Sequence, residues 1–123
     1  MICKIDLMAK PRMTRRDSWP PVRKCVAKYW KFKDELVACA KKEGFILGDR
    51  IYMEFHIPMA KSWSKKKKAL MLGKPHQQKS DLDNLEKSVL DSLLPEDCTV
   101  WHIEAKKLWA EESMLVLENI YEW

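Results

Sequence analysis

The sequence predicts a single α/β domain of the α+β kind, in which about four strands form a sheet packed against two main helices. The chain has 123 residues, enough for one modest core but not for two, so we expect one domain over residues 1–123. Hydrophobic residues at 46% and charged residues at 33% are typical of a folded protein with a charged surface. The third observation is the changing hydrophobic period, which separates helices from strands.

Four segments have the composition of strands. Their apolar side chains occupy every second position or form a short run between turn residues. Pro58 ends the clearest of them, and the polar residues 111–113 form a turn between the last two. The expected strands are residues 2–7, 50–57, 99–109 and 114–121.

Two long segments have the apolar spacing of amphipathic helices. The first covers residues 22–43, and Gly44 suits its C-terminal cap. The second begins at the capping residue Ser80 and stops at Pro95, and residues 62–73 suit a short helix with a very basic first turn. The expected apolar stripes are Val22, Cys25, Val26, Tyr29, Trp30, Leu36, Val37 and Ala40 in the first helix and Leu82, Leu85, Val89, Leu90 and Leu93 in the second.

The net charge of +5 conceals a strong asymmetry along the chain. Residues 1–79 hold 20 Lys and Arg against 7 Asp and Glu, a balance of +13, whereas residues 80–123 hold 3 against 11, a balance of −8. A basic stretch of this size attracts polyanions such as nucleic acid. The acidic third cannot serve that purpose, but its carboxylates suit a cation that bridges protein to phosphate.

Other compositional features argue against membrane, secreted and zinc-binding proteins. No apolar run approaches the roughly 18 residues of a membrane span, and Lys4 and Asp6 interrupt the N-terminal apolar stretch, so we expect a cytoplasmic protein. The four cysteines form no C-x-x-C pair, and we expect reduced, mostly buried thiols. The three histidines are expected on polar faces or in loops, not as metal ligands, because magnesium prefers oxygen. The cysteines are Cys3, Cys25, Cys39 and Cys98, and the histidines are His56, His76 and His102.

The start of the second long helix carries the residues best suited to chemistry. Asp81 and Asp83 would lie about 200° apart on a regular helix, so they converge only if Asp81 occupies the irregular cap. Asp83, Lys87 and Asp91 share one helix face at four-residue steps, and a lysine beside a metal-binding acid stabilises charge developing on phosphate. The alternative is that the aspartates cap the helix and the Asp/Lys pairs decorate a solvated face.

A further acidic pair, Glu96 and Asp97, follows Pro95 just before a predicted strand. It completes a site at the helix start only if that strand lies beside the helix. The ordinary role of acidic residues after a proline is to form a turn.

The thirteen residues from Asp81 to Leu93, D-L-D-N-L-E-K-S-V-L-D-S-L, resemble the D-x-D-N-L-x-K-x-x-x-D-x-L signature of the RusA family of Holliday junction resolvases. The resemblance extends over nearly the whole chain. Three departures are Glu96, where many relatives have Asp, Thr99, where Gln or His is frequent, and Ser80, where a proline is frequent. Other elements in the family's order are the loop Lys10-Pro11-Arg12, the strand ending at Pro58, and Glu96-Asp97 followed by a strand with Lys106 and Lys107.

The resemblance implies a RusA-like homodimer with a mixed sheet. It implies resolution of four-way DNA junctions by paired symmetric cleavage with Mg²⁺, or Mn²⁺ in its place, in DNA recombination and repair. It also implies that Asp81, Asp83 and Asp97 are catalytic metal ligands and that Lys87 is a catalytic lysine, whereas Asp91 has a structural or secondary role. Small resolvases of this kind resemble phage or prophage proteins.

Two basic segments supply the candidate contacts to the DNA backbone. Four lysines near a helix N-terminus oppose the helix dipole, which favours a binding partner, although a solvated charge run is an equally good explanation. Trp19 and Trp63 lie in these segments and either stack on unpaired bases or, more commonly, cover a core edge. The candidate contacts are Lys10, Arg12, Arg15, Arg16, Lys65, Lys66, Lys67 and Lys68.

The sequence leaves the dimer interface and the exact activity open. The apolar run 114–117 is a candidate interface, although core packing is the commoner reason for such a run. Two other functions fit the same residues: a nuclease acting on flaps, forks or other branched DNA, and a non-catalytic nucleic-acid-binding protein that uses the same basic face.

Overall fold

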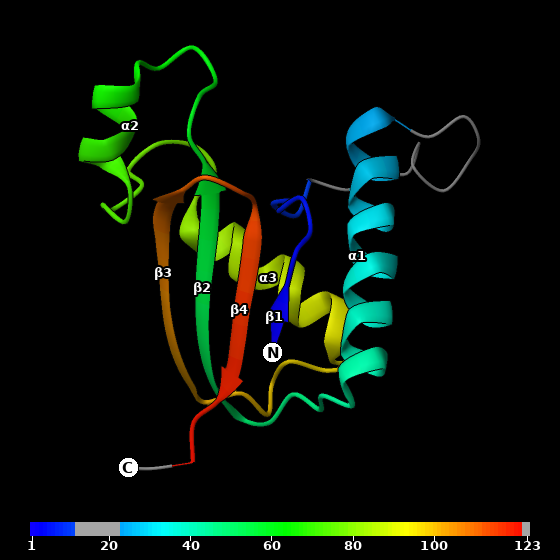
Figure 1. Cartoon of the computed structure of the whole chain (residues 1–123). Coiled ribbons are helices and arrows are strands. Elements are labelled where there is room, and N and C mark those ends of the chain that lie inside the picture. The colour runs from blue at the N-terminus through cyan, green and yellow to red at the C-terminus, as the bar shows by residue number, and fades with distance from the viewer. Residues whose placement is uncertain (12–22, 122–123) are drawn as a thin grey trace.

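The computed structural model describes residues 1–11 and 23–121, and its elements form a sheet with helices packed against it (Figure 1). In chain order they are β1 (Ile2–Cys3), α1 (Lys24–Glu43), β2 (Arg50–Pro58), α2 (Lys65–Met71), α3 (Leu82–Leu93), β3 (His102–Ala110) and β4 (Met114–Asn119). The strand order is β1-β4-β2-β3, with β2 and β3 parallel and the other neighbours antiparallel. The predicted fold class, a small α+β domain with a mixed four-stranded sheet, is confirmed.

Strand β2 is central, and alternation decides which of its side chains enter the core. Ile51, Met53 and Phe55 are fully buried, while the side chains between them lie on the other face and are half-buried. By the same alternation Arg50 belongs to the other face, but it is buried, with its guanidinium 5.2 Å from the centre of the Trp101 ring. The strand therefore has the predicted core face and one unpredicted buried cation.

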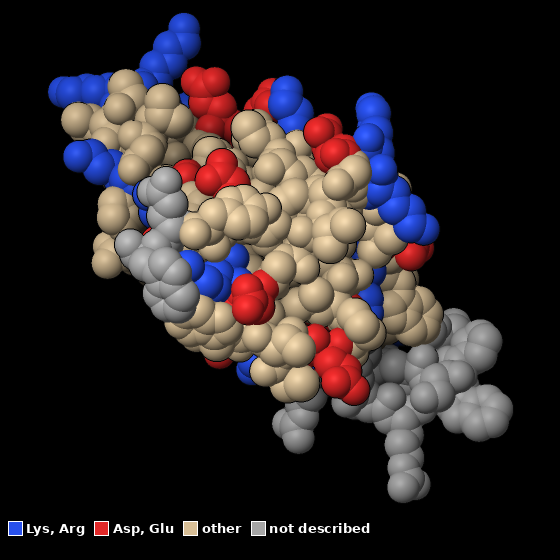
Figure 2. All heavy atoms as spheres, turned by 90° about the horizontal axis from the view of Figure 1, so that it is seen from below, with Lys and Arg blue, Asp and Glu red and all other residues tan. Residues whose placement is uncertain are grey.

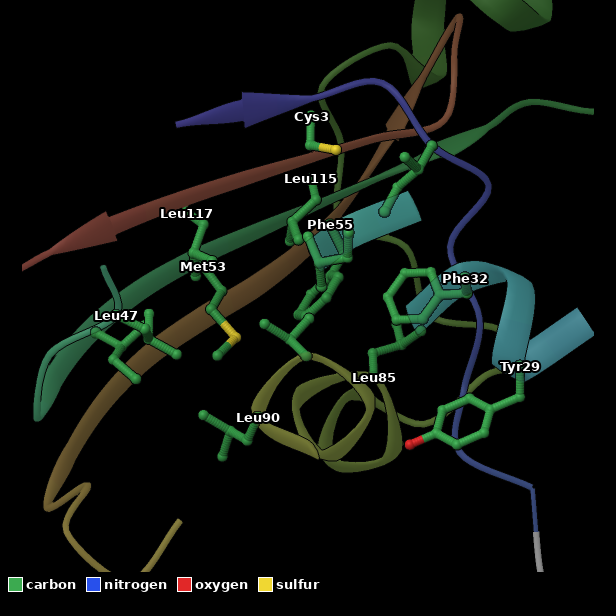
Figure 3. Packing of buried hydrophobic residues seen from close by; sticks show 14 residues of the cluster. Cys3, Tyr29, Phe32, Leu47, Met53, Phe55, Leu85, Leu90, Leu115 and Leu117 are labelled. Atoms are coloured by element: carbon green, nitrogen blue, oxygen red, sulfur yellow. The ribbon is translucent and has the colours of Figure 1, made fainter. Parts of the chain in front are cut away.

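Helices α1 and α3 pack together and meet the sheet in one hydrophobic cluster (Figure 3). Gly44 ends α1 in the left-handed conformation with φ 63°, as expected. The expected stripe was wrong at Trp30, which is 44% exposed. It also omitted Phe32, which is buried because steps of three and four residues from Tyr29 lead to Phe32 and then to Leu36 on the same helix face. The buried residues are Val26, Tyr29, Phe32, Leu36 and Ala40 in α1 and Leu85, Ser88, Val89 and Leu90 in α3.

Three strands are shorter than predicted because pairing partners limit them. β1 stops at Cys3, close to the point where β4 begins, because the register would place residue 4 opposite Met114 and residue 5 already opposite the turn residue Ser113. β3 begins at His102 because that residue pairs with Arg50, the first residue of β2. β4 likewise ends at Asn119, two residues before the expected end at 121.

The segment after α2 is held against the outer edge of β3. Gly73 donates a backbone hydrogen bond to Trp109 (2.9 Å), His76 donates one to Lys107 (2.9 Å), and Pro75 forms an antiparallel bridge with Leu108. Helix α2 itself has no buried residue and projects beyond the sheet (Figure 1). Among the described helices, none is long and apolar enough to cross a membrane.

The cysteines only partly match the expectation of buried thiols. Cys3 is buried, Cys25 and Cys39 are half-buried, and Cys98 is exposed. All four are free thiols. Burial and the neighbouring Cys39 thiol raise the pKa of Cys3 to about 12, so this group packs as a neutral side chain.

Candidate active site

The N-terminus of α3 is irregular at the residue where convergence of the two aspartates requires it. Asp81 is the N-cap, with an extended backbone at φ −67° and ψ 141°, and its carbonyl accepts the first helical bond from Leu85 (3.2 Å). The expectation that Ser80 caps the helix was wrong by one residue, while the requirement that Asp81 lie at the cap is confirmed. Asp81 and Asp83 are both exposed.

The capping alternative for Asp81 makes a specific prediction, namely a side-chain bond from its carboxylate to a free N–H of the first turn. Asp81 makes no such bond. No other described side chain hydrogen-bonds or ion-pairs with the Asp81 or Asp83 carboxylate. These two charges are therefore available to an external cation.

A lysine from β3 fixes the chain immediately before α3. The Lys107 ammonium donates hydrogen bonds to the carbonyls of Gln78 (2.7 Å) and Ser80 (2.8 Å). Lys107 pairs with the buried Phe55, so its side chain starts on the core face of β3. From there it reaches the turn before α3. The sequence had placed Lys107 only within the family's pattern, and the structure gives it a positioning contact to the residue before Asp81.

A pocket of about 540 Å³ lies along the exposed side of α3. It brings Asp97 from the loop after α3 together with Asn84 and Lys87 from the first two turns of the helix. Asp97 therefore lies beside α3, but neither Asp81 nor Asp83 is among the residues that line this pocket. The full lining is Lys10, Pro11, Asn84, Lys87, Asp91 and Asp97.

Asp91 does not pair with Lys87, its neighbour one turn earlier. Its carboxylate forms an ion pair with Lys10 at 2.6 Å and accepts a hydrogen bond from the Tyr29 hydroxyl at 3.3 Å. The Asp83–Lys87 pair expected of a solvated helix face is also absent among the described residues. Burial and the Asp91 charge raise the pKa of Tyr29 to about 12, so this phenol is a neutral donor to Asp91.

The three aspartates assigned to a metal do not form a preassembled cage. No group of three or more Asp, Glu, His or Cys side chains within the described residues is close enough to hold a metal ion. The donor chemistry nevertheless fits Mg²⁺, which prefers carboxylate oxygens and is commonly held by one or two carboxylates together with substrate phosphates. The exposed, unpaired carboxylates at the start of α3 suit that mode of binding.

Sequence reasoning missed one acidic residue of α3, Glu86. Its side chain is half-buried, and burial, followed by the nearby Asp83 charge, raises its pKa. The three-residue spacing between Asp83 and Glu86 was the available signal, because side chains at this spacing are neighbours on a helix.

Helix α2 exposes Lys65, Lys66 and Lys67 to solvent, while Lys68 is half-buried. The Ser64 hydroxyl accepts a hydrogen bond from the Lys67 N–H (3.2 Å) and caps the helix, as a short capped helix requires. None of the four lysines 65–68 forms an ion pair with another described residue. Figure 2 shows basic side chains projecting on the left, where α2 lies in Figure 1, and on the right, where α1 lies. Arg12, Arg15, Arg16 and Trp19 lie outside the described residues.

Trp63 is engaged within the protein. Its ring lies 4.8 Å from the Trp109 ring, and the Lys67 ammonium lies 4.1 Å from its centre. These contacts match the core-edge interpretation and occupy ring surface that stacking on a base would need. The ring also holds one lysine of α2 against the body of the molecule.

His76 lies in a loop, as expected, but its side chain is buried. It is 4% exposed, stacks 4.3 Å from Trp109, and its Nδ1 has no hydrogen-bond partner among the described residues. Burial and the nearby Lys107 charge lower its pKa, so the ring is a neutral packing group. His56 lies on the other face of the sheet, 3.1 Å from Glu54.

The apolar run 114–117 contributes chiefly to the core. Leu115 and Leu117 are fully buried, and Met114 and Val116 are half-buried. β4 also pairs with β1 and β2 on its two sides, so neither of its backbone edges is free along those ladders. The core interpretation of this run is confirmed for the two leucines.

The mixed sheet, the acidic start of α3 and the lysines beside it are together the features of a nuclease domain. A family model described as Endodeoxyribonuclease RusA matches residues 7–118, nearly the whole chain. The chain belongs to the RusA family of endodeoxyribonucleases, whose members act on branched DNA junctions. No individual curated protein matches the chain closely enough to be counted as a relative.

Proposed function

We propose that this protein is a Mg²⁺-dependent Holliday junction resolvase that cuts two strands of a four-way junction symmetrically as a homodimer. The observation that carries the proposal is the exposed Asp81–Asp83 pair at the irregular start of α3, beside a pocket that contains Lys87 and Asp97. The family match supports the reaction class, and this geometry supports the choice of residues.

Asp81, Asp83 and Asp97 are the residues that would hold Mg²⁺, or Mn²⁺ in its place. The ion, when bound, activates water and neutralises charge on the scissile phosphate. Because these carboxylates are not gathered into a cage, we expect the free protein to bind Mg²⁺ weakly and the DNA phosphate to complete the site.

The chain's own cations orient the phosphate. Lys87 is exposed in the pocket and has no ion-pair partner among the described residues, so its ammonium is available to stabilise negative charge. Lys107 keeps the Gln78 and Ser80 carbonyls fixed, and thereby holds the backbone from which Asp81 extends. The lysines 65–68, together with Lys10, Arg12, Arg15 and Arg16, contact backbone phosphates without reading sequence.

The homodimer follows from the symmetry of the substrate. A four-way junction has approximate two-fold symmetry, and a two-fold dimer presents one site to each of two strands. Paired cutting within the lifetime of one complex requires both sites to be present at once.

The test uses purified protein and a labelled mobile four-way junction, with and without Mg²⁺. Paired nicks at symmetric positions that appear only with Mg²⁺ support the resolvase. Equal cutting of junctions, forks and flaps would favour a broader branched-DNA nuclease, and binding without nicks at any Mg²⁺ or Mn²⁺ concentration would favour a non-catalytic binding protein. Sedimentation of the protein–junction complex measures whether two chains are bound.

A further inference from the structure

We infer that Asp91 is a positioning residue that holds the Lys10 ammonium against the scissile phosphate, and that it is not a metal ligand. This inference rests on the proposed cleavage reaction and adds a second lysine, from outside α3, to the group that acts on the phosphate. The observation behind it is the 2.6 Å ion pair between Lys10 and Asp91 within the pocket that also contains Lys87 and Asp97.

Lys10 is held both at its backbone and at its ammonium group. Its backbone N–H donates to the Asn84 carbonyl (3.3 Å), which attaches the segment before the basic loop to the first turn of α3. Its ammonium is bound by Asp91, and the side chain remains 40% exposed. An ammonium has three N–H donors, so Asp91 leaves donors for a phosphate oxygen.

Asp91 is itself held in place by α1. The Tyr29 hydroxyl donates to the same Asp91 oxygen that binds Lys10, and Tyr29 is 1% exposed. Figure 3 shows the Tyr29 ring in the core with its hydroxyl directed toward α3. A rigid, buried donor therefore fixes the carboxylate, and the carboxylate fixes the lysine.

The charges of the pocket agree with this assignment. Asp91 is compensated by Lys10 and hydrogen-bonded by Tyr29, which leaves it poorly suited to bind a cation. Asp97 and Lys87 have no such partners among the described residues. Within the pocket, Asp97 is thus the carboxylate available to a metal, and Lys10 and Lys87 are the two cations available to a phosphate.

The experiment measures kcat, KM for a four-way junction and the half-saturating Mg²⁺ concentration for five proteins. These are the wild type, Asp91→Asn, Asp91→Glu, Lys10→Met and the double variant Asp91→Asn/Lys10→Met. The matched control is Glu112→Gln, which breaks the exposed Lys4–Glu112 ion pair (3.8 Å), another contact of the N-terminal segment that lies outside the pocket. Thermal unfolding of each variant confirms that it is folded.

We expect Asp91→Asn to lower kcat about tenfold, as removal of one charge-assisted hydrogen bond to phosphate would, without raising KM. The half-saturating Mg²⁺ concentration should stay within about twofold, because no metal ligand is removed. Asp91→Glu should recover part of kcat, and Asp91→Asn should add nothing to Lys10→Met. Lys10→Met keeps the Tyr29–Asp91 bond and tests the inference even if Asp91→Asn unfolds.

Three results would overturn the inference. Unchanged kcat with tighter DNA binding in Asp91→Asn would show that Asp91 only neutralises charge. A large rise in the Mg²⁺ requirement would make Asp91 a metal ligand, and multiplying effects in the double variant would separate it from Lys10. A wild-type protein that does not cut would instead refute the proposed function, so the two failures are distinguishable.

Discussion

Two sets of lysines are assigned to the proposed reaction, and they differ in how they are held. Lys107 and Lys10 have specific partners on other elements, at 2.6–2.8 Å from their ammonium groups. The lysines 65–68 of α2 project from a helix with no buried residue and have no ion-pair partner among the described residues. The first set has fixed positions, whereas the second supplies charge.

This difference predicts which kinetic quantity each set controls. A cation held in a fixed position contributes to the chemical step, so its removal lowers kcat. Exposed lysines attract the phosphate backbone as a group, so their removal weakens binding and changes its salt dependence. In the proposed reaction, both sets act on DNA bound at the acidic start of α3.

The largest effect should follow removal of the carboxylates. Asp81→Asn, Asp83→Asn and Asp97→Asn are each expected to abolish cutting, with kcat at least about 100-fold lower, because each removes a proposed metal ligand. Junction binding measured without Mg²⁺ should be retained. Full activity of Asp83→Asn would refute the metal-site assignment, and a loss of junction binding along with cutting would show that the acids act through the fold.

The next effect tests the fixed set at Lys107. Lys107→Met keeps the length of the side chain but loses both bonds to the turn before Asp81, and we expect kcat to fall by about 10- to 100-fold, because a small displacement of a catalytic group costs this much. Lys106→Met is the matched control, since Lys106 is the adjacent residue on the opposite face of β3, with its ammonium 5.7 Å from the Tyr52 ring centre. Equal kcat values for the two variants would remove the positioning role of Lys107.

A smaller effect is expected from the exposed set. Replacing lysines 65–68 together with Ala should raise KM more than it lowers kcat. It should also reduce the slope of log K against log salt by about 0.9 for each DNA phosphate that these lysines neutralise in the wild type. The measurement is junction binding over a range of salt concentrations without Mg²⁺. An unchanged slope would show that the lysine run is a solvated face and would leave the basic loop as the principal DNA-binding segment.

The same distinction explains what the sequence could predict. The acidic cap at Asp81 followed from local helix geometry, and the α2 lysines were visible as a run. The partners of Lys107 lie 27 and 29 residues away, and Asp91 lies 81 residues beyond Lys10, so no local spacing could reveal them. The four-residue spacing in α3 instead suggested a Lys87–Asp91 pair, which the tertiary contact with Lys10 replaces.

The predicted ends of the strands were wrong for a related reason. Alternation correctly gave the buried face of β2, but the ends of β1 and β3 depend on where the partner strands begin. His76 reads as a loop residue in the sequence, and it is buried only because residues 73–76 pair with the edge of β3. Composition can identify a loop without showing that the loop is docked.

The smallest effect concerns stability, at the docked segment that leads from α2 toward the site. His76 is buried beside Lys107 and its pKa is lowered, so the unfolded chain binds a proton more readily than the folded protein. Its contribution is therefore fully present above the ordinary histidine pKa near 6.5 and is lost as pH falls below that value toward the lower folded pKa. His76→Phe keeps the ring against Trp109 and removes both the titration and the unpartnered Nδ1.

The melting temperatures of the wild type and His76→Phe should accordingly diverge as pH is lowered from about 7.5 to about 5, with the variant becoming the more stable by a few degrees. Parallel curves would mean that the ring remains accessible to protons in the folded state and that the segment 73–76 is not firmly docked. In that case the contacts of Lys107 with Gln78 and Ser80 would be the first that fix the chain between α2 and Asp81. The fixed part of the chain would then begin at that turn.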